Sequence, residues 1–165
     1  MHATVSSYLE EDHLRIEMAL RRATSSGDRI QPEAYAQFRC ALLRHIGMEE
    51  KILFPAIRNA TAGNLLPGVD QLHLDHGALA ALLVPTPTKS ILDAIRTILQ
   101  GHNRIEEGPE GIYRQFEKLP GTDADSVLAR LQAARSVALN PHVDNTTAVE
   151  SMRAAVRRAG YSFDL

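Results

Sequence analysis

Residues 45–55 read HIGMEEKILFP, so that a histidine, His45, stands four residues before a glutamate, Glu49. On an α-helix this spacing puts both side chains on one face, one turn apart. The same unit returns in the stretch HNRIEE, where His102 stands four residues before Glu106. Because the unit occurs twice, the sequence indicates an internal two-fold repeat built from helices.

Each unit is preceded by a single histidine that directly follows an aspartate, in the pairs Asp12-His13 and Asp75-His76. The four histidines of this pattern are 26 to 32 residues apart, which is the length of a helix with a short turn. Four helices that each present an imidazole or a carboxylate inward can hold two metal ions in the core of a bundle. The pattern therefore predicts an all-α fold, a four-helix bundle around a two-metal site.

The composition is that of an ordinary globular protein. With 165 residues the chain is long enough for one domain with a substantial core, and its net charge of −2 gives no reason to expect nucleic acid or a membrane as partner. Its single cysteine, Cys40, excludes an internal disulfide and fits a reducing compartment.

Two further features bear on location. The sequence has no run of roughly 18 consecutive apolar residues, the minimum for a membrane-spanning helix. The acidic residues Glu10, Glu11 and Asp12 occupy positions at which a secretory signal peptide would carry its apolar segment. We therefore expect a cytoplasmic protein, either a monomer or a homodimer.

Periodicity and helix-end signals predict the helical segments. Ser7 and Glu10 form a capping box at the start of the first segment, Pro32 suits the first turn of the second, and Thr86 precedes the fourth. Thr147 and Glu150 form another capping box. The expected segments are 7–25, 32–55, 67–83, 87–119, 122–137 and 147–158. Residues 1–119 would form the bundle, and residues 120–165 a C-terminal helical appendage that covers the bundle, a partner protein or a second subunit.

The second segment has an apolar stripe at helical spacing that includes His45 and Glu49. Its other members are Tyr35, Phe38, Leu42, Ile52 and Ala56. Proline lacks the amide hydrogen that a helix interior needs, so Pro55 is expected to kink or end the helix nearby.

A lone His-x-x-x-Glu pair is weak evidence, since His13 and Glu17 make a third such pair. The stronger evidence is that helical periodicity assigns interior positions to two glutamates and four histidines. Buried unpaired charge is very costly, and two divalent cations would compensate it. The alternative is a polar core of hydrogen-bonded His–Glu pairs. The predicted metal ligands are His13, His45, Glu49, His76, His102 and Glu106. Imidazole and carboxylate groups suit iron, manganese or zinc.

These motifs resemble the hemerythrin-like, HHE cation-binding family. The resemblance covers about residues 7–118 and rests on Asp12-His13, His45-x-x-x-Glu49 with the trailing residues 51–55, Asp75-His76 and His102-x-x-x-Glu106. It implies an antiparallel up-down four-helix bundle with two iron ions joined by carboxylates and an oxo or hydroxo bridge. The closest branch has four histidines and two glutamates, and includes iron-centre repair proteins and peroxide-responsive proteins.

Two departures from the family matter. The repair proteins usually carry an N-terminal extension with a cysteine, which is absent here. The oxygen carriers use a fifth histidine four residues before the third-helix ligand, and Leu72 occupies that position here. His73 lies three residues before His76 instead, either as a further ligand or as an outer or solvated group.

Other residues allow two interpretations. Glu17, Glu50 and Glu107 are expected to flank the site, with ligation or bridging as the alternative. Tyr35 and Tyr113 are expected to be core aromatics, with a hydroxyl near the ligands as the alternative. Gly47, Gly77 and Gly101 lie beside ligands and indicate either a close helix approach, a passage for a small ligand, or tolerance. Cys40 is expected to be buried, and His2 and His142 to be solvated.

The sequence supports three hypotheses of function. The first is a di-iron protein that reacts with or senses dioxygen, peroxide or nitric oxide, with catalase-like peroxide consumption as a possible activity. The second is iron storage or donation. The third is an interaction module whose metal is structural and whose C-terminal helices bind a protein. Unsaturated coordination favours the first, because structural metal sites tend to be closed.

Overall fold

The computed structural model describes residues 3–25, 27 and 29–165; the expected position of His2 and part of the turn expected near Ser26 lie outside these residues. All regular elements within the described ranges are helical. They are α1 (Val5–Ala23), α2 (Pro32–Met48), the π-helix η1 (Glu49–Leu53), α3 (Phe54–Ala60), α4 (Val69–Leu82), α5 (Lys89–Glu106), α6 (Ile112–Lys118), α7 (Ala124–Gln132) and α8 (Thr146–Arg158). None of the helices in these ranges has the length and apolar character needed to cross a membrane.

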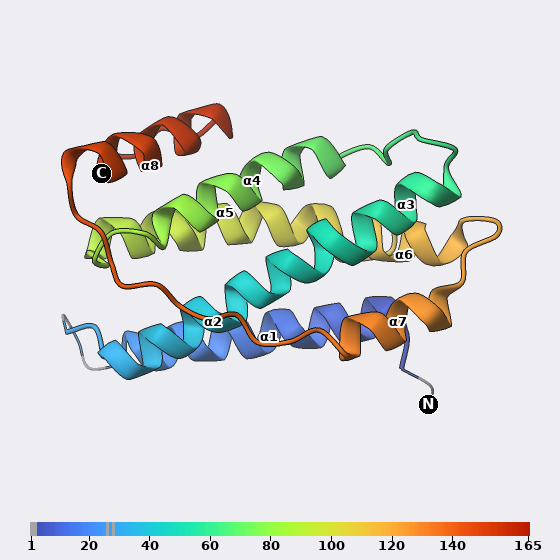
Figure 1. The fold of residues 1–165 in the computed structure, drawn as a ribbon, viewed down its shortest axis with the longest axis horizontal. Helices are drawn as coiled ribbons and strands as arrows, with labels where there is room; N and C mark the ends of the chain where they lie inside the picture. Colours follow the sequence, from blue (N-terminus) through green and yellow to red (C-terminus); the bar gives the residue numbers. More distant parts are fainter. Residues whose placement is uncertain (1–2, 26, 28) are drawn as a thin grey trace.

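The predicted four-helix arrangement is confirmed. The long helices are α1, the continuous run α2–η1–α3, α4 and α5, and they lie side by side in Figure 1. Their apolar faces form two clusters of buried side chains. One cluster holds Leu20, Phe38, Leu79 and Ile95, and the other holds Leu9, Leu53, Leu72 and Phe116. On each long helix the predicted ligand lies between residues of the two clusters, so that the site occupies the middle of the bundle.

Several helix ends differ from those expected. The first helix begins at Val5, because the hydroxyl of Thr4 accepts from the amide of Ser7 while the Ser7 hydroxyl accepts from the amide of Thr4. Glu10 instead pairs with Arg114, so the capping box predicted at Ser7 is wrong. The helix also ends at Ala23, before the expected turn at Ser25.

Later helix starts are displaced by the same kind of competition between neighbouring caps. Thr88, not Thr86, caps α5 by accepting from the amide of Ile91. Asn145, not Thr147, caps α8 by accepting from the amide of Ala148. Thr86 is bound elsewhere, since its amide and hydroxyl both donate to Asp144 at 2.7 Å.

The π-helix η1 corrects the predicted register after Glu49. Beyond this point the buried residues are Leu53 and Ile57, whereas the expected Ile52 and Ala56 are only partly buried. A π-turn spans one residue more than an α-turn, which shifts every later side chain by one position. The wider turn also precedes Pro55, and the chain continues as a helix to Ala60 instead of ending at the proline.

The fourth segment is also interrupted. Helix α5 ends at Glu106, and α6 begins only after a turn that contains Gly108 at a φ of 85°. At Gly111 a Cβ atom would lie 2.2 Å from the carbonyl oxygen of Glu106, so that the turn requires glycine there. The expected continuation to residue 119 is therefore a separate short helix, and it brings Tyr113 back toward the bundle.

The C-terminal residues pack on the bundle and share its core. Val127 and Leu131 of α7 belong to one hydrophobic cluster, and Met152 and Val156 of α8 belong to the other. Helix α7 is shorter than the predicted 122–137, and an extended segment then crosses the bundle to α8, which lies along α4 (Figure 1). Gly160, at a φ of 90°, ends α8 as predicted.

Candidate metal centre

The structure brings all six predicted ligands together in the interior. They form two groups that share both glutamates, and within each group one possible ligand atom per residue lies within 4.8 Å of the others. The first group is His13, His45, Glu49 and Glu106, and the second is Glu49, His76, His102 and Glu106. All six side chains are buried, and the two glutamates are completely inaccessible.

The two carboxylates lie between the histidine pairs. Oε1 of Glu49 is 3.5 Å from Nε2 of His45, and Oε2 is 3.0 Å from Nε2 of His76. Glu49 begins the π-helix, a local form that is frequent at functional sites, and thus directs one oxygen toward each group.

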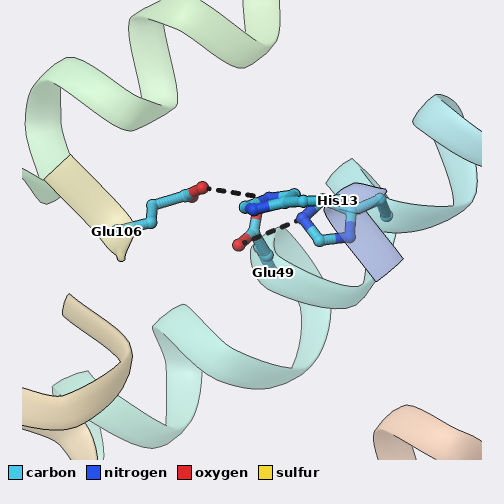
Figure 2. A group of neighbouring side chains, drawn as sticks. His13, Glu49 and Glu106 are labelled. Carbon is cyan, nitrogen blue, oxygen red and sulfur yellow. Dashed lines mark ion pairs between the residues drawn. The ribbon is translucent and has the colours of Figure 1, made fainter. Parts of the chain in front are cut away.

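Glu106 repeats this arrangement from the last turn of α5. Its Oε2 is 3.3 Å from Nε2 of His13, and its Oε1 is 3.0 Å from Nε2 of His102. Figure 2 shows the Glu106 carboxylate directed toward His13, with Glu49 beside them. Each carboxylate therefore offers one oxygen to each histidine pair, which is the geometry of a bridging ligand.

Unpaired buried atoms test whether metal ions fit. Oε2 of Glu49, both carboxylate oxygens of Glu106 and Nε2 of His76 are buried without a hydrogen bond to any described residue, although each lies 3.0 to 3.3 Å from a nitrogen or oxygen atom of another ligand. An unsatisfied buried carboxylate is expensive, and two divalent cations would satisfy all of these atoms at once. The donor set of imidazoles and carboxylates fits such ions, and the overlapping groups indicate a dinuclear metal site.

The other ring nitrogen of every histidine contacts an outer carboxylate. Nδ1 of His13 lies 2.6 Å from Glu107, and Nδ1 of His76 lies 2.6 Å from Glu50. Nδ1 of His45 lies 3.0 Å from Asp12. The fourth contact is an ion pair between Nδ1 of His102 and Asp75, at 3.4 Å, without hydrogen-bond geometry. A carboxylate accepts the Nδ1 proton, leaves Nε2 free to bind a metal and fixes the orientation of the ring.

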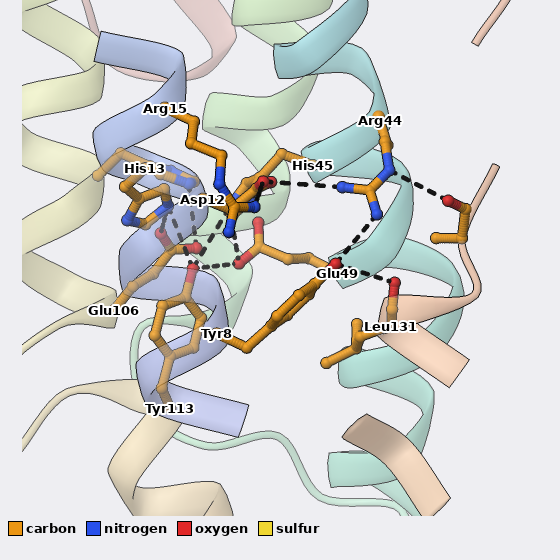
Figure 3. A network of polar contacts seen from close by, with 12 residues as sticks. Tyr8, Asp12, His13, Arg15, Arg44, His45, Glu49, Glu106, Tyr113 and Leu131 are labelled. Carbon is orange, nitrogen blue, oxygen red and sulfur yellow. Dashed lines mark hydrogen bonds and ion pairs between the residues drawn. The ribbon is translucent and has the colours of Figure 1, made fainter. Parts of the chain in front are cut away.

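The hydroxyl of Tyr113 lies inside the site, on the side of the first group. It donates to Oε1 of Glu49 at 2.5 Å and lies 3.2 Å from Nε2 of His13 (Figure 3). Burial, and then the negative charges of Glu106 and Glu49, raise the pKa of this phenol well above its usual value. Tyr113 thus keeps its proton and is a fixed hydrogen-bond donor beside the ligands.

Charge in the cluster favours protonated imidazoles when no metal is bound. Burial lowers the pKa of His13, but its contacts with Glu106 and Glu107 outweigh burial and raise that pKa to about 9. The same balance, with Glu49 and Glu50 as partners, raises the pKa of His76 to about 9.

His102 and His45 follow the same rule. Burial lowers the pKa of His102, and the charge of Glu106 with the contact to Asp75 raises it to about 10. The pKa of His45 is also raised, because Glu49 and Asp12 outweigh burial. Without metal, protons compensate the buried carboxylates, and metal ions must displace them.

A cavity of about 790 Å³ connects the first group to the surface between α1, α2 and α5. Its wall includes the rings of His13, His45 and His102. Six aliphatic side chains line it: Ile16, Leu20, Leu42, Ile46, Leu79 and Leu99. Polar residues such as Gln100 and Arg104 complete the lining. A small molecule could therefore reach the metal-binding side chains along a path lined by both aliphatic and polar groups.

The residues of uncertain role have definite places. His73 lies outside both groups; its side chain is 69% exposed and contacts Glu50. Glu50 and Glu107 accept from ligand histidines, and Glu17 pairs with Arg21 at the surface. A Cβ at Gly47 or Gly77 would meet no atom within 4 Å, and one at Gly101 would lie 3.8 Å from the hydroxyl of Tyr161, so none of the three marks a tight approach of helices.

Cys40 and His142 are less buried and more buried, respectively, than the sequence indicated, whereas Tyr35 is as expected. Cys40 is only partly buried, because it lies under the extended segment, where its thiol contacts the carbonyl of Val137. His142 is also partly buried; its ring stacks on Tyr35 and contacts the carbonyl of Val84. Tyr35 is a core aromatic, as expected.

Several residues around the ligands were not anticipated from the sequence. Asp12 and Asp75 were recognised as part of the motif. The contacts of Asp12 with His45 and of Asp75 with His102 were not expected. Arg44 contacts Asp12, and Tyr161 donates to Asp75. Tyr161 is 86 residues away from Asp75 in the chain, and no local pattern could have revealed that contact.

Comparison with known proteins agrees with this geometry. The family model described as Hemerythrin HHE cation binding domain matches residues 4–146. No curated protein and no solved structure gives a significant match. The matched residues include both groups and end at the start of α8.

Proposed function

The chain belongs to the hemerythrin HHE cation-binding family, and from this premise we propose that it holds two iron ions and reacts with or senses dioxygen, peroxide or nitric oxide. The proposed ligands are His13 and His45 for one ion, His76 and His102 for the other, and Glu49 and Glu106 as bridges. Manganese or zinc could occupy the same ligands. Iron supplies the electrons that reduction of dioxygen or peroxide requires, which zinc cannot do.

The observation that carries this proposal is the cavity of about 790 Å³ that reaches His13, His45 and His102. Structural metal sites are closed, whereas reactive sites keep a position for a small ligand. Each group offers four protein ligand residues, which leaves room for a solvent-derived bridge and an external molecule. The cavity therefore favours reaction with a small molecule over a purely structural metal.

The protein's own residues would control the approach of that molecule. The cavity has room for small neutral molecules such as dioxygen and hydrogen peroxide, and its wall offers them both aliphatic and polar groups. The hydroxyl of Tyr113 keeps its proton and donates it to Glu49, so that it could donate to an oxygen atom placed near His13 only by giving up that bond. The outer carboxylates keep the four imidazoles in place throughout.

We favour peroxide consumption over oxygen carriage, because Leu72 stands where the resemblance puts a fifth histidine in the carriers. Leu72 is completely buried in an apolar cluster and offers no ligand. With fewer protein ligands, both irons can accept an external molecule.

Stopped-flow mixing of the iron-loaded protein with hydrogen peroxide tests this function. We expect peroxide loss with oxygen release that is much faster than for the His45→Ala variant with the same amount of free iron. Equal rates would refute the peroxide reaction. A reversible dioxygen adduct would indicate a carrier or sensor instead, and rapid release of variable amounts of iron to a chelator would indicate storage.

A further inference from the structure

The two buried aspartates that orient ligand histidines are held by different kinds of partner. Asp12 contacts Nδ1 of His45 through one oxygen, at 3.0 Å. Its other oxygen accepts from Arg15 at 3.0 Å and lies 3.7 Å from Arg44 (Figure 3). The negative charge of Asp12 is therefore shared with two cations.

Asp75 has neutral partners instead. One oxygen lies 3.4 Å from Nδ1 of His102, and the other accepts from the amide of Gln71 at 2.8 Å and from the hydroxyl of Tyr161 at 3.1 Å. Asp75 is completely buried. No cation of the described residues pairs with it apart from the histidine, so that its charge acts mainly on His102.

This difference has an electronic consequence for metal ions. A carboxylate that keeps its negative charge makes the imidazole in contact with it a stronger electron donor to the metal. A carboxylate paired with arginine has a smaller effect on its imidazole. The arginines also add positive charge near the first group, which disfavours the ferric state there. The remaining outer carboxylates, Glu107 and Glu50, are alike in being partly exposed, at 38% and 25%, and contribute less to the difference.

We propose that Tyr161 is a positioning residue of the metal centre and that the two irons are unequal, the iron at His76 and His102 being oxidised first. This inference rests on the proposed two-iron function. Tyr161 acts through Asp75: its hydroxyl and Gln71 hold the carboxylate toward His102 without supplying a positive charge. The iron at His13 and His45, beside Tyr113 and the cavity, keeps its electron longer.

The C-terminal segment supplies Tyr161 by a defined route. Helix α8 packs along α4, Gly160 turns the chain at its end, and the carbonyl of Ala159 accepts from Gln71 at 3.0 Å. The ring of Tyr161 then stacks on Phe163 with centroids 5.6 Å apart. Ala159, Tyr161 and Phe163 lie beyond residue 146, where the family match ends, whereas their partners Gln71 and Asp75 lie within the matched residues.

The same segment reaches the opposite half of the centre. The carbonyl of Ala134, just after α7, accepts from Arg44 at 3.1 Å, and the hydroxyl of Tyr8 also accepts from Arg44, at 3.0 Å (Figure 3). Arg44 is thus fixed next to Asp12 by Ala134, which lies outside the four long helices, and by Tyr8 of α1. The C-terminal segment therefore supports a cation at one aspartate and a neutral phenol at the other.

A spectroelectrochemical titration of the full-length, iron-loaded protein tests this inference. The wild type should lose two electrons in two separate steps, with a half-oxidised state between them. In Tyr161→Phe the carboxylate of Asp75 loses a neutral hydrogen-bond donor and therefore keeps more of its negative charge. Only the potential of the iron at His76 and His102 should then fall. In Arg44→Gln the potential of the second iron should fall, and the two steps should move together.

Phe163→Leu is the matched control, since it alters the packing of the same segment and leaves the hydroxyl in the chain. It should leave both potentials unchanged. Selective loss of one iron from Tyr161→Phe, with normal loading of Phe163→Leu, would also support a positioning role. Two irons that titrate together in the wild type, or potentials that do not respond to Tyr161→Phe, would overturn this inference alone. A wild-type protein that holds fewer than two irons would overturn the proposed function as well.

Discussion

Metal binding at pH 7 should release at least about three protons per chain, because the apo-protein protonates histidines that must be neutral to bind a metal. The pKa values of His13, His76 and His102 are about 9, 9 and 10, so each of these rings is about 99% or more protonated at pH 7. The raised pKa of His45 adds part or all of a fourth proton. The count is therefore a direct measure of how many buried imidazoles become ligands.

The sign of the pH dependence follows from the same count. The apo-protein binds more protons than the loaded protein, so the overall affinity for two ions should rise with pH. Three displaced protons give up to about a thousandfold per pH unit, and the dependence should flatten as the pH passes 9 to 10.

Isothermal titration calorimetry measures the release directly. Zinc or manganese is added to the apo-protein at pH 7 in buffers of different ionisation enthalpy, and the slope of the observed enthalpy against that quantity gives the number of protons. His73→Asn is the control and should release the same number, because His73 is exposed and outside both groups. A slope below one proton per chain would refute the reasoning.

Three further predictions follow from the contacts. The unfolding free energy of the apo-protein should fall between pH 6.5 and pH 10, because the raised pKa of His102 stabilises the fold fully below about 6.5 and no longer does so above about 10; denaturant titrations that show a rise would contradict this. Leu53→Ala should cost about 2–5 kcal/mol and Ile52→Ala only about 1 kcal/mol, since the π-helix buries Leu53 instead; equal losses in urea unfolding would argue against that register. Asp75→Asn should weaken metal affinity about 10- to 100-fold by competition with a chelator, and unchanged affinity would mean that Asp75 does not support His102.

The sequence predicted those features that depend on helical periodicity. The interior positions of His13, His45, His76 and His102 follow from their spacing to neighbouring apolar residues, and the structure buries all four. Periodicity failed after Glu49, because a π-turn adds a residue that no α-helical pattern contains. Two capping residues were displaced, from Ser7 to Thr4 and from Thr86 to Thr88, because neighbouring hydroxyl side chains compete for the capping position.

The residues that contact Asp12 and Asp75 could not be predicted from the sequence, for another reason. Contacts such as Tyr161 to Asp75 join residues that meet only after α8 has packed on α4. Arg44 looks like an ordinary surface residue until the carbonyl of Ala134 and the hydroxyl of Tyr8 are brought to it. Neither contact has a characteristic spacing in the sequence, because the separation of the two residues depends on the length of the segment that crosses the bundle.

Iron stoichiometry combined with X-ray absorption tests the central claim, that Glu49 and Glu106 bridge two metal ions. The account predicts two irons per chain in the anaerobically loaded wild type, each with nitrogen and oxygen ligands and with a second iron as a near neighbour. It also predicts that the Glu49→Gln, Glu106→Gln double variant loses that iron–iron signal, since no shared carboxylate is left. One iron per chain, or two irons without a near iron neighbour in the wild type, would contradict it.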